Sequence, residues 1–439
     1  MKSSTGLHVG SKLVVITIFL LAAQCASQPN QEAPATRGVG YTASIDNRKN
    51  GVVPPLGPKL LLRSSTGSHE LWLQADPKNR CALSLRLAHT NSIYRLVWTA
   101  NYFAVTPGGC DKCTVIFTKE GDLQLHILYR GRTSMAWNTK TGGRNVKSMY
   151  LPNTGDLQLR NADKKVIFSS FGVREWAMLP PQRLRVGEVL KSPDQDQEAV
   201  GADSTVQVLF NNGQYFLTLQ KTGDLQLIMN GPKPQVYWSL KKTLFKGNLK
   251  QVAYAAINKD GGLGLFTQNN QLVWGSPPPP KGFYASPYFG IDTYGNLKTY
   301  YAFKNHAWFS SFKAFDNNCD LPNHCGDYSI CSGADSKCSC PPQFTRTGIR
   351  SNAPYCKRNS NVAKCSRKSF LELKGYDANI NMYINPKRIG LTSCKASCLA
   401  SCDCDGFYYD MATAFCHQTT RFRTLRKVNN QKKLVYIKM

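Results

Sequence analysis

The pentapeptide GDLQL occupies residues 121–125 and recurs at residues 155–159 and 223–227. In each copy a turn-forming glycine precedes alternating apolar and polar side chains, the pattern of a half-buried β-strand entered from a tight turn. Related segments stand at residues 81–85 (CALSL), 261–265 (GGLGL) and 295–299 (GNLKT). The sequence therefore contains six related strand units.

The spacing of these units indicates a duplication. The copies at 121 and 261, and those at 155 and 295, are separated by 140 residues, and the FSSF of residues 168–171 recurs at residues 309–312. An aromatic residue follows each start after 13 to 17 residues: Trp98, Trp137, Phe168, Trp238, Trp274 and Trp308. We therefore expect two tandem domains of three repeats each.

A repeat of roughly 35 residues without helical periodicity is expected to give about four short strands, too few to bury an apolar face alone. Three repeats must then share one core, which predicts a three-sided β-prism with the recurring aromatic rings at its centre. A six-bladed propeller is the alternative, although its blades normally run about 40–45 residues without a break. The polar residues 192–201 are interpreted as the linker between the two triplets.

The N-terminal residues predict export from the cell. Lys2 and Lys12 precede the apolar run LVVITIFLLAA at residues 13–23, which is too short to span a membrane and is followed by small residues. This arrangement is typical of a secretory signal peptide, here residues 1–26, with a retained anchor as the alternative. Since no later stretch reaches the roughly 18 apolar residues of a membrane helix, we expect an extracellular chain with no membrane span after signal removal.

The cysteine positions agree with an oxidising compartment. Twelve of the 16 cysteines lie between Cys319 and Cys416, which predicts a disulfide framework. Zinc binding is the alternative, but no histidine cluster accompanies these cysteines. Nearer the N-terminus, the CDKC of residues 110–113 lies in a β-rich region, which favours a small loop disulfide between Cys110 and Cys113 over a redox motif. Cys81 is then left over as a free, buried or intermolecular thiol.

Several motifs carry a family resemblance. VWTAN at residues 97–101, the GDLQL repeats and FSSF resemble the bulb-type, or monocot mannose-binding, lectin domain. Residues 319–356, which include CGDYSIC, are similar to the EGF-like module of plant S-locus glycoproteins, and residues 365–439 resemble their PAN/apple domain. In the related receptor kinases a membrane span and a kinase follow, whereas this sequence stops at Met439, so the resemblance is to the secreted glycoproteins that lack a kinase.

The resemblance implies a mainly β fold: a signal peptide at 1–26, tandem β-prism lectin domains at 58–178 and 200–316, a small EGF-like module at 319–356 and an α+β PAN/apple domain at 365–439. Both C-terminal modules are expected to be rich in disulfides. The implied pairs are Cys319–Cys331, Cys325–Cys338, Cys340–Cys356, Cys394–Cys416, Cys398–Cys404 and Cys365–Cys402.

In bulb-type lectins each repeat can present Gln-x-Asp-x-Asn-x-Val-x-Tyr, whose alternate side chains share one face of a strand and contact mannose. No repeat of this sequence has the full motif, so mannose binding is expected to be weak. The resemblance leaves Asp292, Asn296 and Tyr300 as the best pocket, with Gln220 and Asp260 as single matches in the two preceding repeats. An outward Asn or Tyr on a strand is also typical of a solvated edge residue.

Charge and motifs bear on function. Lys and Arg number 55 against 27 Asp and Glu, a formal charge of +28, and residues 421–439 hold seven cations and no acid. Such a field attracts polyanions, and nucleic acid is not an expected partner outside the cell. The sequence contains no HExxH, GxSxG or phosphate-loop motif, so we expect no enzyme, no cofactor and no metal.

Two functional hypotheses follow. The leading one is a secreted lectin-like recognition protein that binds cell-wall glycans or glycoproteins through degenerate mannose sites in the plant apoplast or cell wall. The alternative is a basic structural cell-wall protein that is retained by acidic polysaccharide and has no specific sugar pocket.

Overall fold

The computed structural model describes residues 33–46, 57–88, 94–194, 209–231, 234–280, 285–302, 308–350, 353–378 and 387–439. Their regular structure is mainly β-strand, with two short α-helices, α1 (Leu240–Thr243) and α2 (Leu391–Ala400). The expected signal peptide lies outside the described residues. Within those residues, no helix combines the length and the apolar character that a membrane crossing requires.

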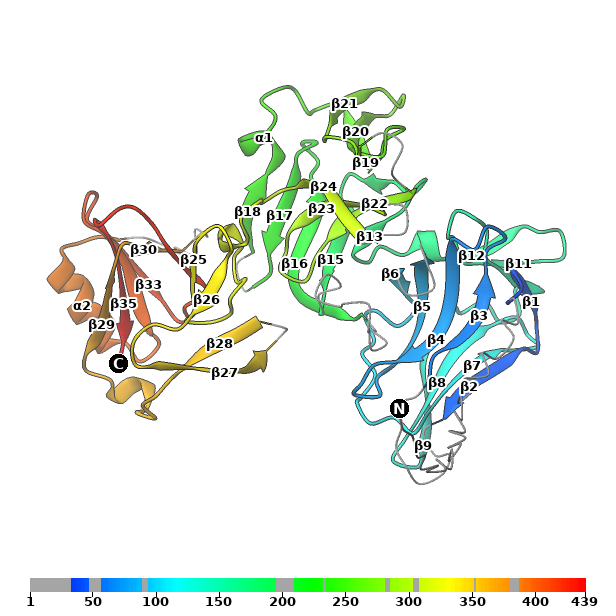
Figure 1. Cartoon of the computed structure of the whole chain (residues 1–439), viewed down its shortest axis with the longest axis horizontal. Coiled ribbons are helices and arrows are strands. Elements are labelled where there is room, and N and C mark those ends of the chain that lie inside the picture. Colours follow the sequence, from blue (N-terminus) through cyan, green and yellow to red (C-terminus); the bar gives the residue numbers. More distant parts are fainter. Residues whose placement is uncertain are drawn as a thin grey trace, which may run out of the picture. The chain divides into compact units, whose positions relative to one another are not determined.

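The first three repeats form three antiparallel sheets of four strands, which we call the first prism (Figure 1). These are sheet A of β1 (Thr36–Gly38), β10 (Ser148–Tyr150), β11 (Gln158–Arg160) and β12 (Val166–Ser169); sheet B of β2 (Thr42–Asp46), β7 (Lys112–Phe117), β8 (Leu123–Tyr129) and β9 (Arg132–Asn138); and sheet C of β3 (Lys59–Arg63), β4 (His69–Ala75), β5 (Cys81–Ala88) and β6 (Tyr94–Thr99).

The last three repeats form a second prism of the same design. Its sheets are sheet D of β13 (Ala177–Met178), β22 (Ala285–Ile291), β23 (Leu297–Ala302) and β24 (Trp308–Lys313); sheet E of β14 (Leu184–Arg185), β19 (Val252–Ile257), β20 (Leu263–Thr267) and β21 (Leu272–Gly275); and sheet F of β15 (Val189–Pro193), β16 (Asn211–Leu219), β17 (Leu225–Met229) and β18 (Gln235–Ser239). The expected tandem β-prism fold is confirmed.

Each repeat supplies three strands rather than four. The fourth strand of every sheet comes from a leading segment, whose strands join the repeats in reverse order: β1 pairs with the third repeat, β2 with the second and β3 with the first. β13, β14 and β15 do the same in the second prism. The expected bounds of 58–178 and 200–316 therefore need correction, since the first prism begins at Thr36 and the second at Ala177.

The leading strands also correct the expected linker. Ser192 and Pro193 are not part of a linker between the two prisms, because they belong to strand β15 (Val189–Pro193) of sheet F. Residues 195–201 of the expected linker lie outside the described residues. The chain enters the second prism before it reaches this polar stretch.

Backbone geometry explains the glycine that opens five of the repeats. All five have φ between 79° and 88°, a region that L side chains rarely adopt, and they are Gly121, Gly155, Gly223, Gly261 and Gly295. At Gly155 an added Cβ would also lie only 2.4 Å from Cδ2 of the buried His69. A substitution there would strain the turn and displace the histidine.

The six sheets share one pairing. A core residue of the second strand of each repeat lies opposite an aromatic residue of the third, immediately before a register shift; the pairs are Leu85–Trp98, Leu125–Trp137, Leu159–Phe168, Leu227–Trp238, Leu265–Trp274 and Thr299–Phe312. The aromatic of the last repeat is thus Phe312 and not Trp308. The two FSSF copies are not equivalent, because Phe312 corresponds to Phe168.

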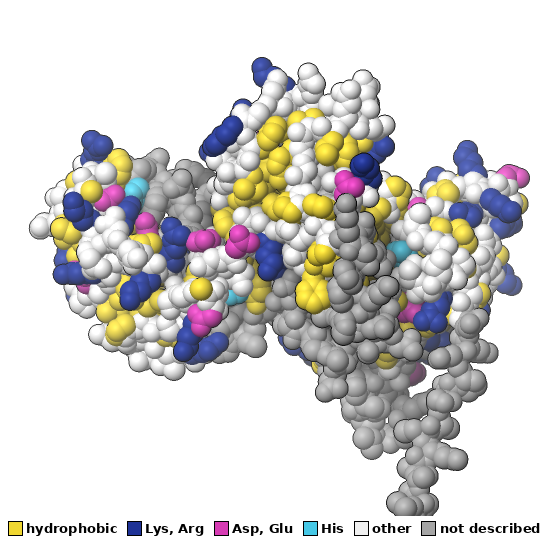
Figure 2. Space-filling model, turned by 45° about the horizontal axis from the view of Figure 1, so that its top comes forward, with side chains coloured by type: hydrophobic (Ala, Val, Ile, Leu, Met, Phe, Trp, Pro, Cys, Tyr) yellow, Lys and Arg dark blue, Asp and Glu magenta, His cyan; other side chains and the backbone are white. Residues whose placement is uncertain are grey.

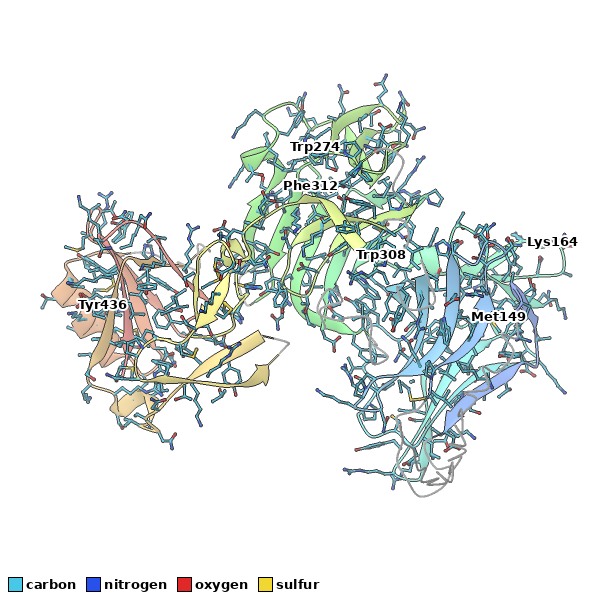
Figure 3. The ribbon with its side chains drawn as sticks, in the orientation of Figure 1. Met149, Lys164, Trp274, Trp308, Phe312 and Tyr436 are labelled. Carbon is cyan, nitrogen blue, oxygen red and sulfur yellow. A yellow bond between two sulfur atoms is a disulfide. The ribbon has the colours of Figure 1, made fainter. Side chains whose placement is uncertain are left out.

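These rings bring the sheets together. Trp98 and Trp137 meet edge to face with 6.0 Å between ring centroids, and Trp137 meets Phe168 in the same way at 6.2 Å. In the second prism the ring centroids of Trp274 and Phe312, both labelled in Figure 3, are 5.8 Å apart. The ring of Trp308 instead contacts Tyr288 of its own sheet. Rings from different sheets thus meet inside each prism, as the repeat pattern predicts.

Sheets C and D join the two prisms. The Arg95 guanidinium on β6 lies 6.0 Å from the ring centroid of Tyr300 on β23. Thr99 N donates to the buried Glu175 Oε2 at 2.8 Å, just before β13. One apolar cluster runs through both prisms. The outward faces of sheets C and D are therefore covered by this packing.

The C-terminal residues form three further sheets. Sheet G contains β26 (Lys337–Ser339), β25 (Ile330–Ser332), β34 (Leu425–Lys427) and β30 (Tyr376–Asp377); sheet H contains β27 (Phe344–Arg350) and β28 (Ala353–Arg358); sheet I contains β29 (Phe370–Lys374), β35 (Lys433–Lys438), β32 (Gly406–Asp410), β33 (Phe415–Thr419) and β31 (Lys387–Arg388). Since β25 pairs in parallel with β34, the EGF-like and PAN-like segments share sheet G.

The six disulfides of these segments have the pairing that the resemblance implies. The N-terminal cysteines differ from expectation. Cys81 on β5 bonds to Cys113 on β7, and the expected Cys110–Cys113 bridge is wrong, because Cys113 faces the core on its strand. Among the described residues Cys110 is the free cysteine; its thiol is buried, and burial raises its pKa, so a redox CxxC motif gains no support.

We expect acid to destabilise the first prism through His69. Burial lowers the pKa of His69 from 6.5 to about 4. Because the unfolded chain takes up a proton at higher pH than the folded chain, the free energy of unfolding falls by about 3 kcal/mol between pH 7 and pH 4 through this group. In urea unfolding, the free energy of unfolding of His69→Gln should fall less between pH 7 and pH 4 than that of the parent chain. An equal decrease in the free energy of unfolding of the parent chain and of His69→Gln over this pH range would contradict the role of His69.

Candidate functional site

The Asp of each GDLQL copy has a structural task. Asp122 Oδ1 accepts from Thr141 N at 3.0 Å and from Thr139 Oγ1 at 2.8 Å, which fixes the end of the third strand to the turn before the second. Asp156 accepts from Phe171 N at 3.1 Å, and Asp224 from Lys241 N at 3.0 Å, in the same way. The GDLQL motif therefore encodes a closing contact within each repeat.

The carboxylate of Asp122 is held charged by these contacts. Burial by itself raises the pKa of Asp122, but hydrogen bonds from Gln124, Thr141 and neighbouring side chains outweigh it, so the pKa lies below its ordinary value. A charged carboxylate accepts stronger hydrogen bonds than a neutral one. Its contribution to stability is consequently lost as pH falls through this depressed pKa.

A second set of contacts runs along the outward faces of sheets A and B. Gln124 Nε2 donates to Asp122 Oδ2 at 2.9 Å, and Gln124 Oε1 lies 2.8 Å from His126 Nε2. On sheet A, Gln158 Nε2 donates to Asp156 Oδ2 at 2.7 Å, and Gln158 Oε1 accepts from Arg160 Nε at 2.8 Å. The side chains of Gln124, His126, Gln158 and Arg160 are half-exposed, because they alternate with buried leucines on each strand.

The expected pocket on sheet D is buried. Asn296 is fully buried; its Oδ1 accepts from Phe315 N at 3.1 Å, and its Nδ2 donates to Phe315 O at 2.8 Å. Asp292 forms an ion pair with Lys298 at 3.0 Å, with both side chains at most 8% exposed. Tyr300 is 8% exposed and stacks on Tyr288. Asn296 therefore makes the closing contact that Asp122, Asp156 and Asp224 make in the three GDLQL repeats.

The packing of sheet C on sheet D is the physical reason. The face that contains Tyr300 lies against Arg95 of the first prism. The matching face of sheet C is equally covered, and its Arg86 is buried with its guanidinium 4.2 Å from the ring of Trp72 and 4.0 Å from that of Tyr94. Neither face offers an open strand surface to a sugar.

Gln220 and Asp260 lie elsewhere. Gln220 is half-buried in the turn before β17 of sheet F, where its backbone N donates to Asp224 O at 2.9 Å. Asp260 is exposed in the turn before β20 of sheet E. The five candidate residues thus belong to three different sheets and do not form one pocket.

We expect Asn296→Ala to act on stability. The substitution leaves Phe315 N and Phe315 O without their side-chain partner, which costs about 2 kcal/mol. Chemical denaturation measures this loss, and the exposed Asp260→Ala should change the free energy of unfolding by less than about 0.5 kcal/mol. An unchanged stability of Asn296→Ala would contradict the structural role.

Sequence reasoning missed a cavity in the C-terminal part. It has a volume of about 640 Å³, and residues of the EGF-like and PAN-like segments line it together. Five cations face it against two carboxylates: Lys357, Arg358, Lys364, Arg367 and Arg421, with Asp327 and Asp405. The signal in the sequence was the number of Lys and Arg between residues 357 and 368.

A metal site has little support nearby. His324, Cys325 and Cys338 lie close together. Cys325 and Cys338 are bonded to each other, so they offer no thiolate to a metal.

Similarity to known proteins agrees with this architecture. Residues 266–347 match the S-locus glycoprotein domain. EP1-like glycoprotein 4 of Arabidopsis thaliana is 23% identical over 447 residues, which cover 96% of this chain and 95% of that protein. The chain is therefore similar to S-locus glycoproteins in residues 266–347. This relative, which matches the chain along nearly its whole length, is a glycoprotein by name.

Other relatives match in part. The G-type lectin S-receptor-like serine/threonine-protein kinase SD2-5 of Arabidopsis thaliana is 26% identical over 76% of this chain, which spans only 38% of that kinase. The solved structure of Scilla campanulata agglutinin, described as a fetuin-binding two-domain lectin, has a TM-score of 0.21 and 15% identity, covering 62% of this chain and 92% of that one.

Proposed function

We propose that the chain is a secreted, non-enzymatic lectin-like protein that recognises carbohydrate or glycoprotein in the plant apoplast or cell wall. The observation that carries the proposal is the pair of half-exposed polar rows on sheets A and B, which contain Gln124 and His126, and Gln158 and Arg160. Amide and imidazole groups already fixed by hydrogen bonds bind sugar hydroxyls with little loss of side-chain entropy.

The proposal places recognition on the first prism and away from Asp292, Asn296 and Tyr300. Those three side chains are buried and occupied by internal contacts. Mannose binding through the family motif is therefore expected to be weak or absent.

A glycan array of the full chain tests the proposal. We expect binding to a set of neutral glycans that persists at high salt, since hydrogen bonds to uncharged hydroxyls are not screened. The double variant Gln124→Ala/Gln158→Ala should lose this binding, and Gln220→Ala, in a turn of the second prism, should keep it. The absence of any neutral-glycan signal, or its survival in the double variant, would refute the proposal.

The charge of the chain favours a second candidate, retention by acidic polysaccharide. The formal charge is +28, and Figure 2 shows Lys and Arg side chains spread over the visible face. Distributed charge of this kind gives retention that salt releases. Elution from isolated cell walls by water alone would refute it.

A further inference from the structure

We propose that the cavity between the EGF-like and PAN-like segments is a specific binding site for carboxylated sugars, that is, for the uronate units of an acidic oligosaccharide. This site differs from the polar rows of sheets A and B and does not rest on their function. The proposal also goes beyond retention by overall charge, because a defined cavity binds a short segment of the oligosaccharide through fixed contacts.

The cavity is large enough for such a ligand. Its volume of about 640 Å³ lies within the usual range for small-molecule sites and greatly exceeds the size of an inorganic anion. Ser360 and Asn361 add a hydroxyl and an amide to the lining, and Tyr355 adds an aromatic ring. These groups suit sugar hydroxyls and the apolar face of a sugar ring.

The charges in the cavity are only partly matched. Asp405, with 2% of its side chain exposed, accepts from Arg358 Nη2 at 2.8 Å and from Arg367 Nη1 at 2.9 Å, so one carboxylate serves two guanidinium groups. Lys364 Nζ donates to the backbone oxygens Asp403 O and Thr420 O. These acceptors carry no formal charge, so the charge of Lys364 is not neutralised. Five cations against two carboxylates leave a net formal charge of +3 around the cavity.

Arg358 offers an unused donor to a ligand. Its side chain is 10% exposed, and its Nε is buried without a hydrogen-bond partner among the described residues. Arginine binds carboxylates through two parallel N–H groups, and buried donors are normally satisfied. A uronate carboxylate in the cavity would supply the missing acceptor.

A neighbouring lysine supports a positive potential in this region. Lys438 is buried, and its Nζ donates to Cys398 O, Leu399 O and Ser401 O at the end of α2. Burial lowers the pKa of Lys438, and the cations Lys368, Lys364 and Arg367 lower it further. The cations beside the cavity therefore repel one another, and a bound anion would reduce this repulsion.

Titration calorimetry with trigalacturonic acid tests the site in the full chain at low salt. We expect trigalacturonic acid to bind and the neutral maltotriose not to bind. The variant Lys357→Glu/Lys364→Gln should weaken binding at least about tenfold. The matched control Lys241→Glu/Lys242→Gln, which changes the same charge at exposed positions of the second prism, should stay within about twofold.

A third variant keeps the test independent of net charge. Arg358→Lys keeps the charge and removes the Nε donor, and it should also weaken binding about tenfold. Equal losses of affinity for trigalacturonic acid in the two double variants would show that overall charge alone binds the ligand. That result would overturn the proposal. Inorganic sulfate binding as tightly as trigalacturonic acid would overturn it as well.

The outcome is distinguishable from that of the proposed lectin function. Neutral-glycan binding on the array should be unchanged in Lys357→Glu/Lys364→Gln. Loss of uronate binding with retained neutral-glycan binding assigns the two ligands to two sites.

Discussion

The Asp405→Ala variant is expected to lose about 4 kcal/mol of unfolding free energy. Asp405 is buried and is the shared partner of Arg358 and Arg367, whose side chains are only 10% and 14% exposed. Removing one member of a buried ion pair costs about 3–5 kcal/mol, because the remaining charge is left without compensation.

A third contact adds to this loss. Burial, followed by the charge of Asp405, raises the pKa of Tyr328 to about 12, so its hydroxyl stays protonated and donates to Asp405 Oδ2. Without the carboxylate this half-buried hydroxyl loses its acceptor in the protein. The effect should therefore exceed that of removing a surface ion pair.

Urea unfolding of the full chain measures the change. The exposed Asp403→Ala, two residues away, is the control and should shift the free energy of unfolding by less than about 0.5 kcal/mol. A loss for Asp405→Ala no larger than that of the control would contradict the account of the C-terminal charges.

The Asp122→Ala variant is expected to lose about 3 kcal/mol. The carboxylate accepts four hydrogen bonds, from Gln124 Nε2, Asn138 Nδ2, Thr139 Oγ1 and Thr141 N. Thr141 is buried, so its backbone N–H cannot turn to water when the acceptor is lost.

The last repeat suggests the matching conservative change. Asn296 closes its repeat with an amide, so Asp122→Asn should recover about half of the stability that Asp122→Ala loses. Denaturation of both variants measures this recovery. Equal stability of the parent chain and Asp122→Ala would show that the carboxylate does not close the repeat.

The repeat pattern predicted the prisms because each copy encodes its own local structure. The turn at Gly155 follows from the glycine itself, and the inward position of Leu159 follows from the alternation of apolar and polar residues on its strand. The leading strands could not be found in this way. β13 and β14 contain two residues each, and pairing with a distant repeat defines them.

The closed pocket on sheet D could not be predicted from its own strand. Alternation places Tyr300 on an outward face, but Arg95, about two hundred residues earlier, covers that face in the fold. The Cys81–Cys113 bond has a similar origin, since it joins two sheets and spacing alone favoured the nearer Cys110. Packing between distant repeats produces both the closed pocket and the Cys81–Cys113 bond.

Hydrogen exchange of the full chain, with and without the neutral oligosaccharide that binds most tightly on the array, tests the central claim most directly. We expect bound glycan to slow exchange in Leu123–Tyr129 and Gln158–Arg160, the strands with the open polar rows. Protection of Leu297–Ala302 in sheet D, with none in those two strands, would contradict the account.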